Sequence, residues 1–113
     1  MDDNTLEALR KSIKHWEENL AAKNPKAVST SARDCALCLK FFISPNACLG
    51  CPVFITTSQT CCEGTPYSLA VSRLTIWKSK EPDNNTLRDK FRAAASDEVN
   101  FLKSLLPEED QQP

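Results

Sequence analysis

The sequence has little glycine, a single histidine and no long apolar run. Only two glycines occur in 113 residues, which excludes a glycine-rich phosphate-binding loop. No stretch approaches the roughly 18 consecutive apolar residues that a membrane-spanning helix needs. The first residues are acidic and polar, without the basic start and apolar core of a secretion signal. We therefore expect a cytoplasmic protein with no membrane segment.

Catalytic side chains are equally scarce. His15 is the only imidazole, and its charged neighbours Lys14 and Glu17 place it on a solvated helix face. A cysteine nucleophile needs a base beside it, and a zinc deaminase needs a His-x-Glu or Cys-x-Glu motif ahead of Pro-Cys-x-x-Cys. The sequence contains neither arrangement, so it predicts a binding protein rather than an enzyme.

Three segments have the apolar spacing of helices. The first, residues 5–23, has the N-cap candidate Asn4 and a narrow apolar stripe that packs on the core or mediates self-association. The second begins at Thr65, a favoured N-cap followed by the proline that helix starts accept. The third covers residues 86–106 and ends at Pro107. The stripe of the first segment consists of Leu6, Leu9, Ile13, Trp16 and Leu20.

These segments predict one mainly α domain over residues 1–113, with three or four helices around a zinc-bound cysteine-rich loop. Residues 1–24 form the N-terminal helix and residues 35–64 the loop, within which Phe54–Thr57 has the β propensity of a short strand. Residues 65–107 form an antiparallel helical hairpin. Residues 108–113 lack core-forming side chains and are expected to be disordered. Residues 26–34 fit a loop or a short helix.

Six cysteines fall within residues 35–64, where two Cys-x-x-Cys turns lie nine residues apart. In the reducing cytoplasm such clusters indicate metal binding more often than disulfides. Each turn can present two sulfurs to one ion, and four thiolates satisfy tetrahedral zinc. We predict a structural Zn²⁺ held by Cys35, Cys38, Cys48 and Cys51. An iron–sulfur cluster, free thiols and disulfides are the alternatives.

Two further cysteines complicate this assignment. Cys62 is an alternative ligand, because it leads directly into the helix that begins at Thr65. Adjacent Cys61 and Cys62 could also form a strained disulfide with a redox function. The simplest interpretation is that one of them is a small buried apolar residue and the other is exposed.

The cysteine segment resembles a pattern of small uncharacterised bacteriophage and prophage proteins. The resemblance covers residues 35–67 and consists of Cys35-Ala-Leu-Cys38, Cys48-Leu-Gly-Cys51-Pro-Val and Cys62-Glu-Gly-Thr-Pro-Tyr67. It implies a metal-binding phage accessory protein in the host cytoplasm. Such a protein is expected to bind a host protein or protein complex and to inhibit or redirect it. Anti-defence activity, such as anti-CRISPR inhibition, is one form of this expectation.

Partner contacts are expected at aromatic and arginine side chains, which anchor many interfaces. The candidates are Trp16, Trp77, Phe101, Arg88 and Arg92, although each aromatic could equally belong to the core. The competing hypothesis is a zinc-knuckle protein that binds nucleic acid. The net charge is −1. Because residues 1–7 carry −3 and residues 96–113 carry −4, the segment between them carries about +6, which is only a modest basic footprint.

Overall fold

The computed structural model describes residues 2–30, 35–41, 51–57, 65–81 and 83–107. Within these ranges it contains five α-helices, one short 3₁₀ turn and no strand, which confirms a mainly helical protein. None of the described helices is both long and apolar enough to cross a membrane. The helices are α1 (Asp3–Ala21), α2 (Ala36–Phe41), α3 (Pro52–Thr57), α4 (Pro66–Ser79) and α5 (Asn85–Ser104), and the turn is η1 (Pro25–Ala27).

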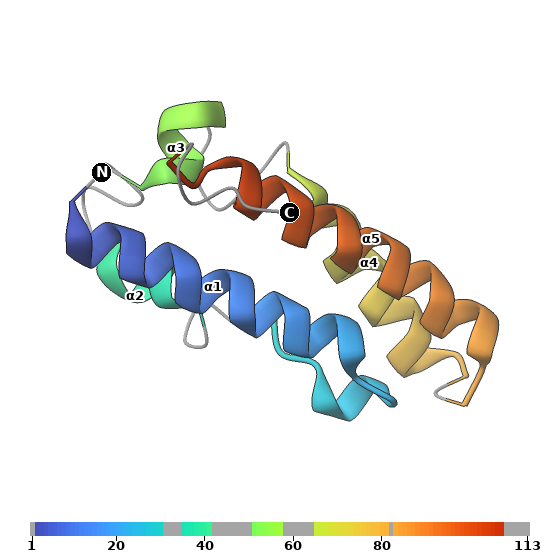
Figure 1. Ribbon diagram of the computed structural model, residues 1–113. Coiled ribbons are helices and arrows are strands. Elements are labelled where there is room, and N and C mark those ends of the chain that lie inside the picture. The colour runs from blue at the N-terminus through green and yellow to red at the C-terminus, as the bar shows by residue number, and fades with distance from the viewer. Residues whose placement is uncertain (1, 31–34, 42–50, 58–64, 82, 108–113) are drawn as a thin grey trace.

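Three long helices make up most of the molecule (Figure 1). The helices α4 and α5 lie side by side and run in opposite directions, and α1 packs against α5. The short helix α2 lies along the first half of α1, and α3 lies near the end of α5. Both short helices therefore sit at one end of the molecule, and both belong to the cysteine-rich segment.

Local side chains decide where the long helices begin. Asp2, rather than the expected Asn4, caps α1, and its carboxylate accepts the backbone N–H of Thr5 at 2.7 Å. This hydrogen bond also lowers the pKa of Asp2. The helix α4 begins as predicted, because Thr65 accepts the Tyr67 backbone N–H at 3.2 Å and proline follows. Asn84 caps α5 in the same way.

The core is built on two aromatic pairs. Trp77 of α4 is 1% exposed and stacks on Phe91 of α5, with ring centroids 5.8 Å apart. Trp16 of α1 meets Tyr67 of α4 edge to face at 6.0 Å. Such pairs add roughly 0.5–1.5 kcal/mol to the burial of their rings. The two pairs thereby join all three long helices.

Residues 28–30 form an extended segment that is fastened to two helices. The buried Asn19 pairs with the backbone of Ser29, donating to its carbonyl oxygen at 2.9 Å and accepting its N–H at 3.1 Å. His15 Nε2 donates to the same carbonyl at 2.8 Å, so this ring is half-buried rather than on the solvated face that its neighbours suggested. Tyr67 Oη donates to the carbonyl of Thr30 at 2.8 Å. The chain is therefore fixed on α1 and α4 five residues before Cys35.

The expected strand at Phe54–Thr57 is wrong, because these residues lie in α3. Pro52 suits the first position of a helix, and the Ile55 backbone N–H donates to the Cys51 carbonyl at 2.9 Å. The hydroxyl of Thr57 adds a bond to the Val53 carbonyl at 2.9 Å. Local hydrogen bonding and the proline thus outweigh the β propensity of these side chains.

Candidate metal centre

The turn from Cys35 to Cys38 has the geometry of a two-thiol ligand pair. Cys35 immediately precedes α2, and the Cys38 backbone N–H donates to the Cys35 sulfur at 3.4 Å. The two side chains also interact with each other through their sulfurs. Both residues are half-buried, and no disulfide joins any two of the three described cysteines. One short turn therefore presents two neighbouring thiols, as the Cys-x-x-Cys spacing predicts.

The buried Ser12 of α1 holds this turn in place. Its hydroxyl accepts the Leu37 backbone N–H at 3.3 Å and lies 3.8 Å from the Cys35 sulfur. Leu37 is 3% exposed and packs in the core beside α1. The helix α2 has only six residues, too few to be stable alone. Its position therefore depends on these contacts with α1.

The environment of Cys35 favours its thiolate. Hydrogen bonding from the Cys38 side chain lowers the pKa of Cys35 to about 6, against the opposing effect of burial. The backbone N–H of Cys38 and the Ser12 hydroxyl also lower the pKa of Cys35. The thiolate is the form of cysteine that binds metals and attacks electrophiles. Cys35 is thus prepared for either chemistry near neutral pH.

Cys51 begins a second short helix that repeats the pattern of the first. Leu37 and Val53, two residues after Cys35 and Cys51, are each 3% exposed. Leu39 and Ile55, four residues after the same cysteines, are 70% and 69% exposed. Each short helix therefore has a cysteine at its start, a buried aliphatic side chain two residues later and an exposed aliphatic side chain four residues later.

Glu98 is an acidic residue in the core that the sequence interpretation did not single out. It lies on α5 and is 2% exposed, and its Oε1 has no hydrogen-bond partner among the described residues. Burial, and to a smaller extent the negative charge of Cys35, raise the pKa of Glu98 to about 8. A signal was present in the sequence, because Glu98 falls between Ala94 and Leu102 in the apolar stripe of the last helix.

The described residues do not bring a complete metal site together. Among them, no three cysteine, histidine or acidic side chains are close enough to hold an ion. Cys48, Cys61 and Cys62 lie outside the described residues. The donor chemistry of Cys35 and Cys38 nevertheless fits zinc, because both are neighbouring thiols and one favours its anion. The four-thiolate Zn²⁺ site therefore stays a prediction.

Of the predicted partner-binding side chains, the aromatic ones pack in or against the core, and the two arginines contact other residues of this chain. Trp16 and Trp77 are 5% and 1% exposed, so both rings belong to the core and neither is available on the surface. Phe101 is half-buried against the same core. Arg88 reaches its neighbour Asp89, with 3.3 Å between nitrogen and oxygen.

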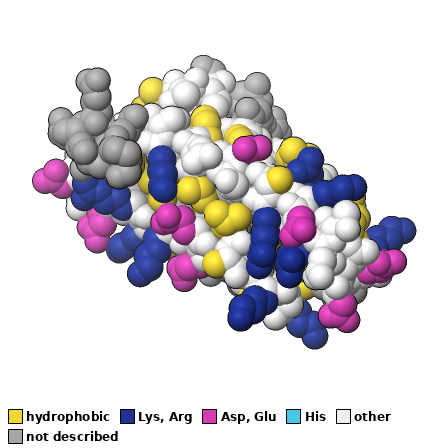
Figure 2. All heavy atoms as spheres, turned by 45° about the vertical axis from the view of Figure 1, so that its right-hand side comes forward, with side chains coloured by type: hydrophobic (Ala, Val, Ile, Leu, Met, Phe, Trp, Pro, Cys, Tyr) yellow, Lys and Arg dark blue, Asp and Glu magenta, His cyan; other side chains and the backbone are white. Residues whose placement is uncertain are grey.

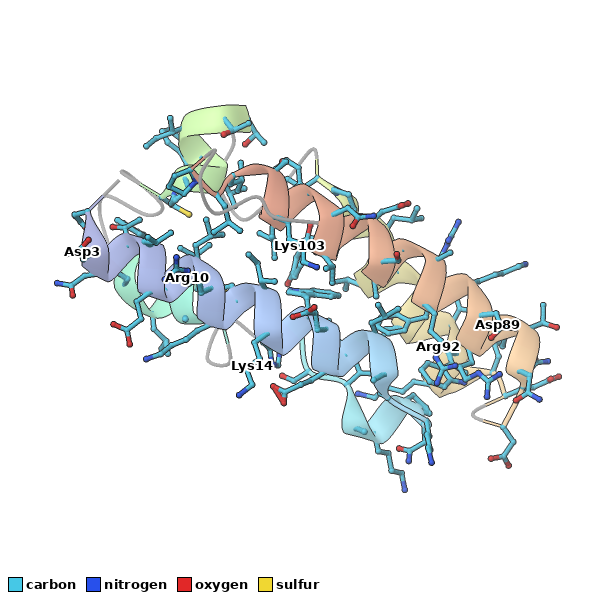
Figure 3. All side chains as sticks on the ribbon, in the orientation of Figure 1. Asp3, Arg10, Lys14, Asp89, Arg92 and Lys103 are labelled. Carbon is cyan, nitrogen blue, oxygen red and sulfur yellow. The ribbon has the colours of Figure 1, made fainter. Side chains whose placement is uncertain are left out.

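Arg92 has a structural contact instead. Its Nη2 donates to the carbonyl oxygen of Ala22 at 2.9 Å, at the end of α1. Figure 3 shows this side chain between α5 and the C-terminal part of α1. A cation near the last carbonyls of a helix stabilises the negative end of its dipole. The last turn of α1 has no basic residue of its own, so α5 provides one.

The face of the molecule drawn in Figure 2 gives the nucleic-acid hypothesis no specific support. Figure 2 shows Lys and Arg side chains mixed with Asp and Glu on the visible face rather than collected in one basic patch. Lys11 pairs with Glu7 at 3.3 Å, and Lys103 pairs with Glu17 at 3.6 Å. Such exposed pairs contribute little to stability.

Comparisons with protein-family models, with curated proteins and with solved structures give no match. The resemblance to phage proteins therefore depends only on the cysteine, proline and tyrosine pattern of residues 35–67.

Proposed function

We propose that the chain is a small zinc-binding protein that docks on another protein through the short helices of its cysteine-rich segment. The observation that carries this proposal is the repeated pattern around Cys35 and Cys51. A Zn²⁺ ion bound to both turns would fix the starts of α2 and α3 relative to each other. Structural zinc supplies folding energy in this way when the surrounding chain cannot.

The proposed contact points are Leu39 and Ile55, hereafter the aliphatic pair. They are the most exposed large apolar residues of the described chain. Each lies one helical turn beyond a cysteine, so the metal would also set the position of each side chain. A single exposed aliphatic residue is ordinary on a protein surface. Two at equivalent positions of two cysteine-led helices favour a contact role.

The cellular setting of this proposal comes from the phage-like motif alone. In that setting the partner is a host protein or protein complex, which the small protein inhibits or redirects in the host cytoplasm. Anti-CRISPR or other anti-defence activity is one case of such docking.

The metal is tested by elemental analysis of the purified chain. We expect one zinc ion per chain, and the double substitution Cys35→Ser with Cys38→Ser should abolish binding. Replacement by Co²⁺ should give the absorption of tetrahedral thiolate coordination. Absence of any metal, together with cysteines paired as disulfides, would contradict the proposal.

Docking is tested by capture from nuclease-treated lysate of the host bacterium, with the partner then purified for a direct binding assay. We expect Leu39→Glu with Ile55→Glu to abolish binding. The matched control is Leu69→Glu with Ile76→Glu, which changes two exposed aliphatic residues of α4 and should leave binding intact. Equal binding by both double variants would show that the aliphatic pair is not the contact surface. A gel shift that weakens steeply with salt would favour nucleic acid instead.

A further inference from the structure

The exposed side of α4 carries almost no charge, unlike the exposed sides of the other long helices. The aliphatic side chains of Leu69 and Ile76 on this side are 46% and 47% exposed. The exposed residues of α1, by contrast, are mostly charged. The centres of protein interfaces are depleted of charge in the same way. The exposed residues of α4 are Ser68, Leu69, Ser72, Thr75, Ile76, Lys78 and Ser79, of which only Lys78 is charged.

Apolar side chains lie on both sides of α4 instead of forming one stripe. Ala70, Leu74 and Trp77 are buried against the rest of the chain, whereas Leu69 and Ile76 face outward. The helix packs mainly against α5 (Figure 1), so its outer side is not covered by a described helix. A helix that is apolar all round is usually covered all round. The outer side of α4 is therefore a surface that a second molecule would complete.

We propose that this surface binds the same surface of a second copy of the chain, so that two chains form a two-fold dimer with antiparallel α4 helices. The contact residues are spaced three, four and three positions apart, which is the spacing of helices that pack along a common seam. None of them lies in α2 or α3, so the proposal goes beyond the zinc and docking function. The residues of this α4 seam are Leu69, Ser72, Ile76 and Ser79.

The α4 seam is complementary to itself when one copy is reversed. Along it, a large aliphatic side chain alternates with a serine. A two-fold axis at the level of Leu74 places Leu69 opposite Ser79 of the partner subunit, and Ser72 opposite Ile76 of the partner subunit. Each layer then combines one large and one small side chain, which lets the two helices interdigitate. A parallel pair in register would instead place aliphatic against aliphatic and serine against serine.

The hydroxyl groups on this side of α4 can be buried at low cost. Thr75 donates to the Val71 carbonyl oxygen at 3.0 Å, and Ser79 donates to the Thr75 carbonyl oxygen at 2.7 Å. Burial of a polar group is costly chiefly when its hydrogen bond is lost, and these bonds lie within α4 itself. The seam also contains no charged residue, so a second copy brings no like charges together.

A second copy fits this surface better than an unrelated protein does, because only self-association requires a surface that matches its own reverse. The apolar stripe of α1 was the segment for which the sequence allowed self-association. That stripe is occupied by the chain's own core, since Leu9, Ile13 and Trp16 are buried. Among the described long helices, α4 therefore provides the surface for a dimer.

The contact is small, so the dimer should be weak and dependent on concentration. With 14 residues, α4 is about 21 Å long and about 10 Å wide. Its projected surface of roughly 200 Å² is well below the ~800 Å² per partner of a standard stable complex. We expect a dissociation constant on the order of 0.1 mM.

The first experiment measures the mass of the full chain by analytical ultracentrifugation between about 5 μM and 1 mM, a range that spans this constant. The average mass of the parent protein should rise from one chain toward two. Leu69→Glu with Ile76→Glu should raise the dissociation constant at least about tenfold. The matched control, Leu39→Glu with Ile55→Glu on the two short helices, should associate like the parent. A parent protein that stays monomeric, or equal association by both double variants, would overturn the proposal.

The second experiment tests the pairing of large with small side chains. Ser72→Ile alone brings two aliphatic side chains into one layer and overpacks it, and Ile76→Ser alone leaves serine opposite serine. Each single variant should therefore associate less than the parent. An equimolar mixture of the two variants restores one large and one small side chain in every layer and should associate nearly like the parent. Circular dichroism verifies that both variants keep the parent's helix content. A mixture that associates no better than the separate variants would also overturn the proposal.

Discussion

The two ends of the molecule are stabilised by different means. At one end, α4 and α5 bury Trp77 against Phe91, and α1 adds its own apolar face. At the other end, α2 and α3 have six residues each and expose the aliphatic pair. Helices of that length gain little from their own hydrogen bonds. The comparison suggests a self-sufficient helical body and a cysteine-rich end that needs additional constraints.

Metal removal should have the largest effect and should separate the two ends. Structural zinc contributes roughly 10–16 kcal/mol of apparent binding free energy in small domains. After chelation, we expect amide hydrogen-exchange protection to weaken in residues 36–41 and 52–57 and to persist in α1, α4 and α5. Exchange measured by mass spectrometry checks this. Equal loss of protection in all five helices would show that the body is not independent of the metal.

Removing an aromatic ring from the core should instead destabilise the body formed by the three long helices. Trp77→Ala should cost about 3–5 kcal/mol of folding free energy, because it leaves a cavity beside Phe91. Chemical denaturation monitored by circular dichroism measures the loss with and without metal. The control is Lys78→Ala at the exposed neighbouring position, with an expected change within about 0.5 kcal/mol. A small effect of the tryptophan substitution would mean that the body is not held by this pair.

Glu98 should make the cysteine end sensitive to pH. Its folded pKa of about 8 lies above the ordinary 4.5, so the folded state disfavours the ionised form. The resulting destabilisation is absent below about pH 4.5, grows as pH rises and is complete above pH 8. Glu98→Gln should therefore gain stability relative to the parent, by a few kcal/mol at pH 9 and less at pH 5.

Denaturation of the metal-free proteins at pH 5, 7 and 9 measures this difference. The Cys35 thiol is present in both proteins, so their difference reports the carboxyl group together with its interaction with Cys35. Asp97→Asn makes the same change at the adjacent exposed position and should show no such trend. A stability difference that does not vary with pH would show that Glu98 is ionised equally in the folded and unfolded states.

The fastening of residues 28–30 should have the smallest of these effects. Asn19→Ala removes both hydrogen bonds to Ser29 and should cost about 1–3 kcal/mol. Tyr67→Phe removes only the bond to Thr30, with an expected cost near 1 kcal/mol. Thermal denaturation compares both with Glu18→Ala, an exposed substitution on α1. If Asn19→Ala behaves like this control, the segment is held by other contacts.

The sequence predicts the long helices well because their signals are local. Thr65 and the proline after it predict the start of α4, and the apolar stripes predict the buried faces of α1 and α5. The short helix α3 is missed because six residues carry no clear period and their β-branched side chains suggest a strand. The N-cap of α1 is displaced by two residues, since Asp2 and Asn4 are both acceptable caps.

The candidate site depends on contacts between distant segments, which a sequence does not reveal. The Cys-x-x-Cys spacing predicts the neighbouring thiols of Cys35 and Cys38. It does not predict that Ser12, 23 residues earlier, lies beside Cys35, or that Glu98 interacts electrostatically with Cys35. Trp16 and Trp77 were candidates for a surface because aromatic residues serve both cores and interfaces. Only the packing of three helices decides between these two roles.

Two side-chain contacts between α1 and α5 mark how the two helices are aligned along their length. Arg92 donates a hydrogen bond to the carbonyl oxygen of Ala22 at the end of α1, and Lys103 pairs with Glu17 nearer the middle of the same helix. The partly buried Arg92 bond opposes sliding of one helix along the other by a turn, whereas the exposed pair of Lys103 and Glu17 adds little. Because Ser12 lies on α1 and Glu98 on α5, this alignment also determines which of these side chains act on the Cys35 thiol. A helix insertion far from every cysteine would therefore change the chemistry of the thiol pair.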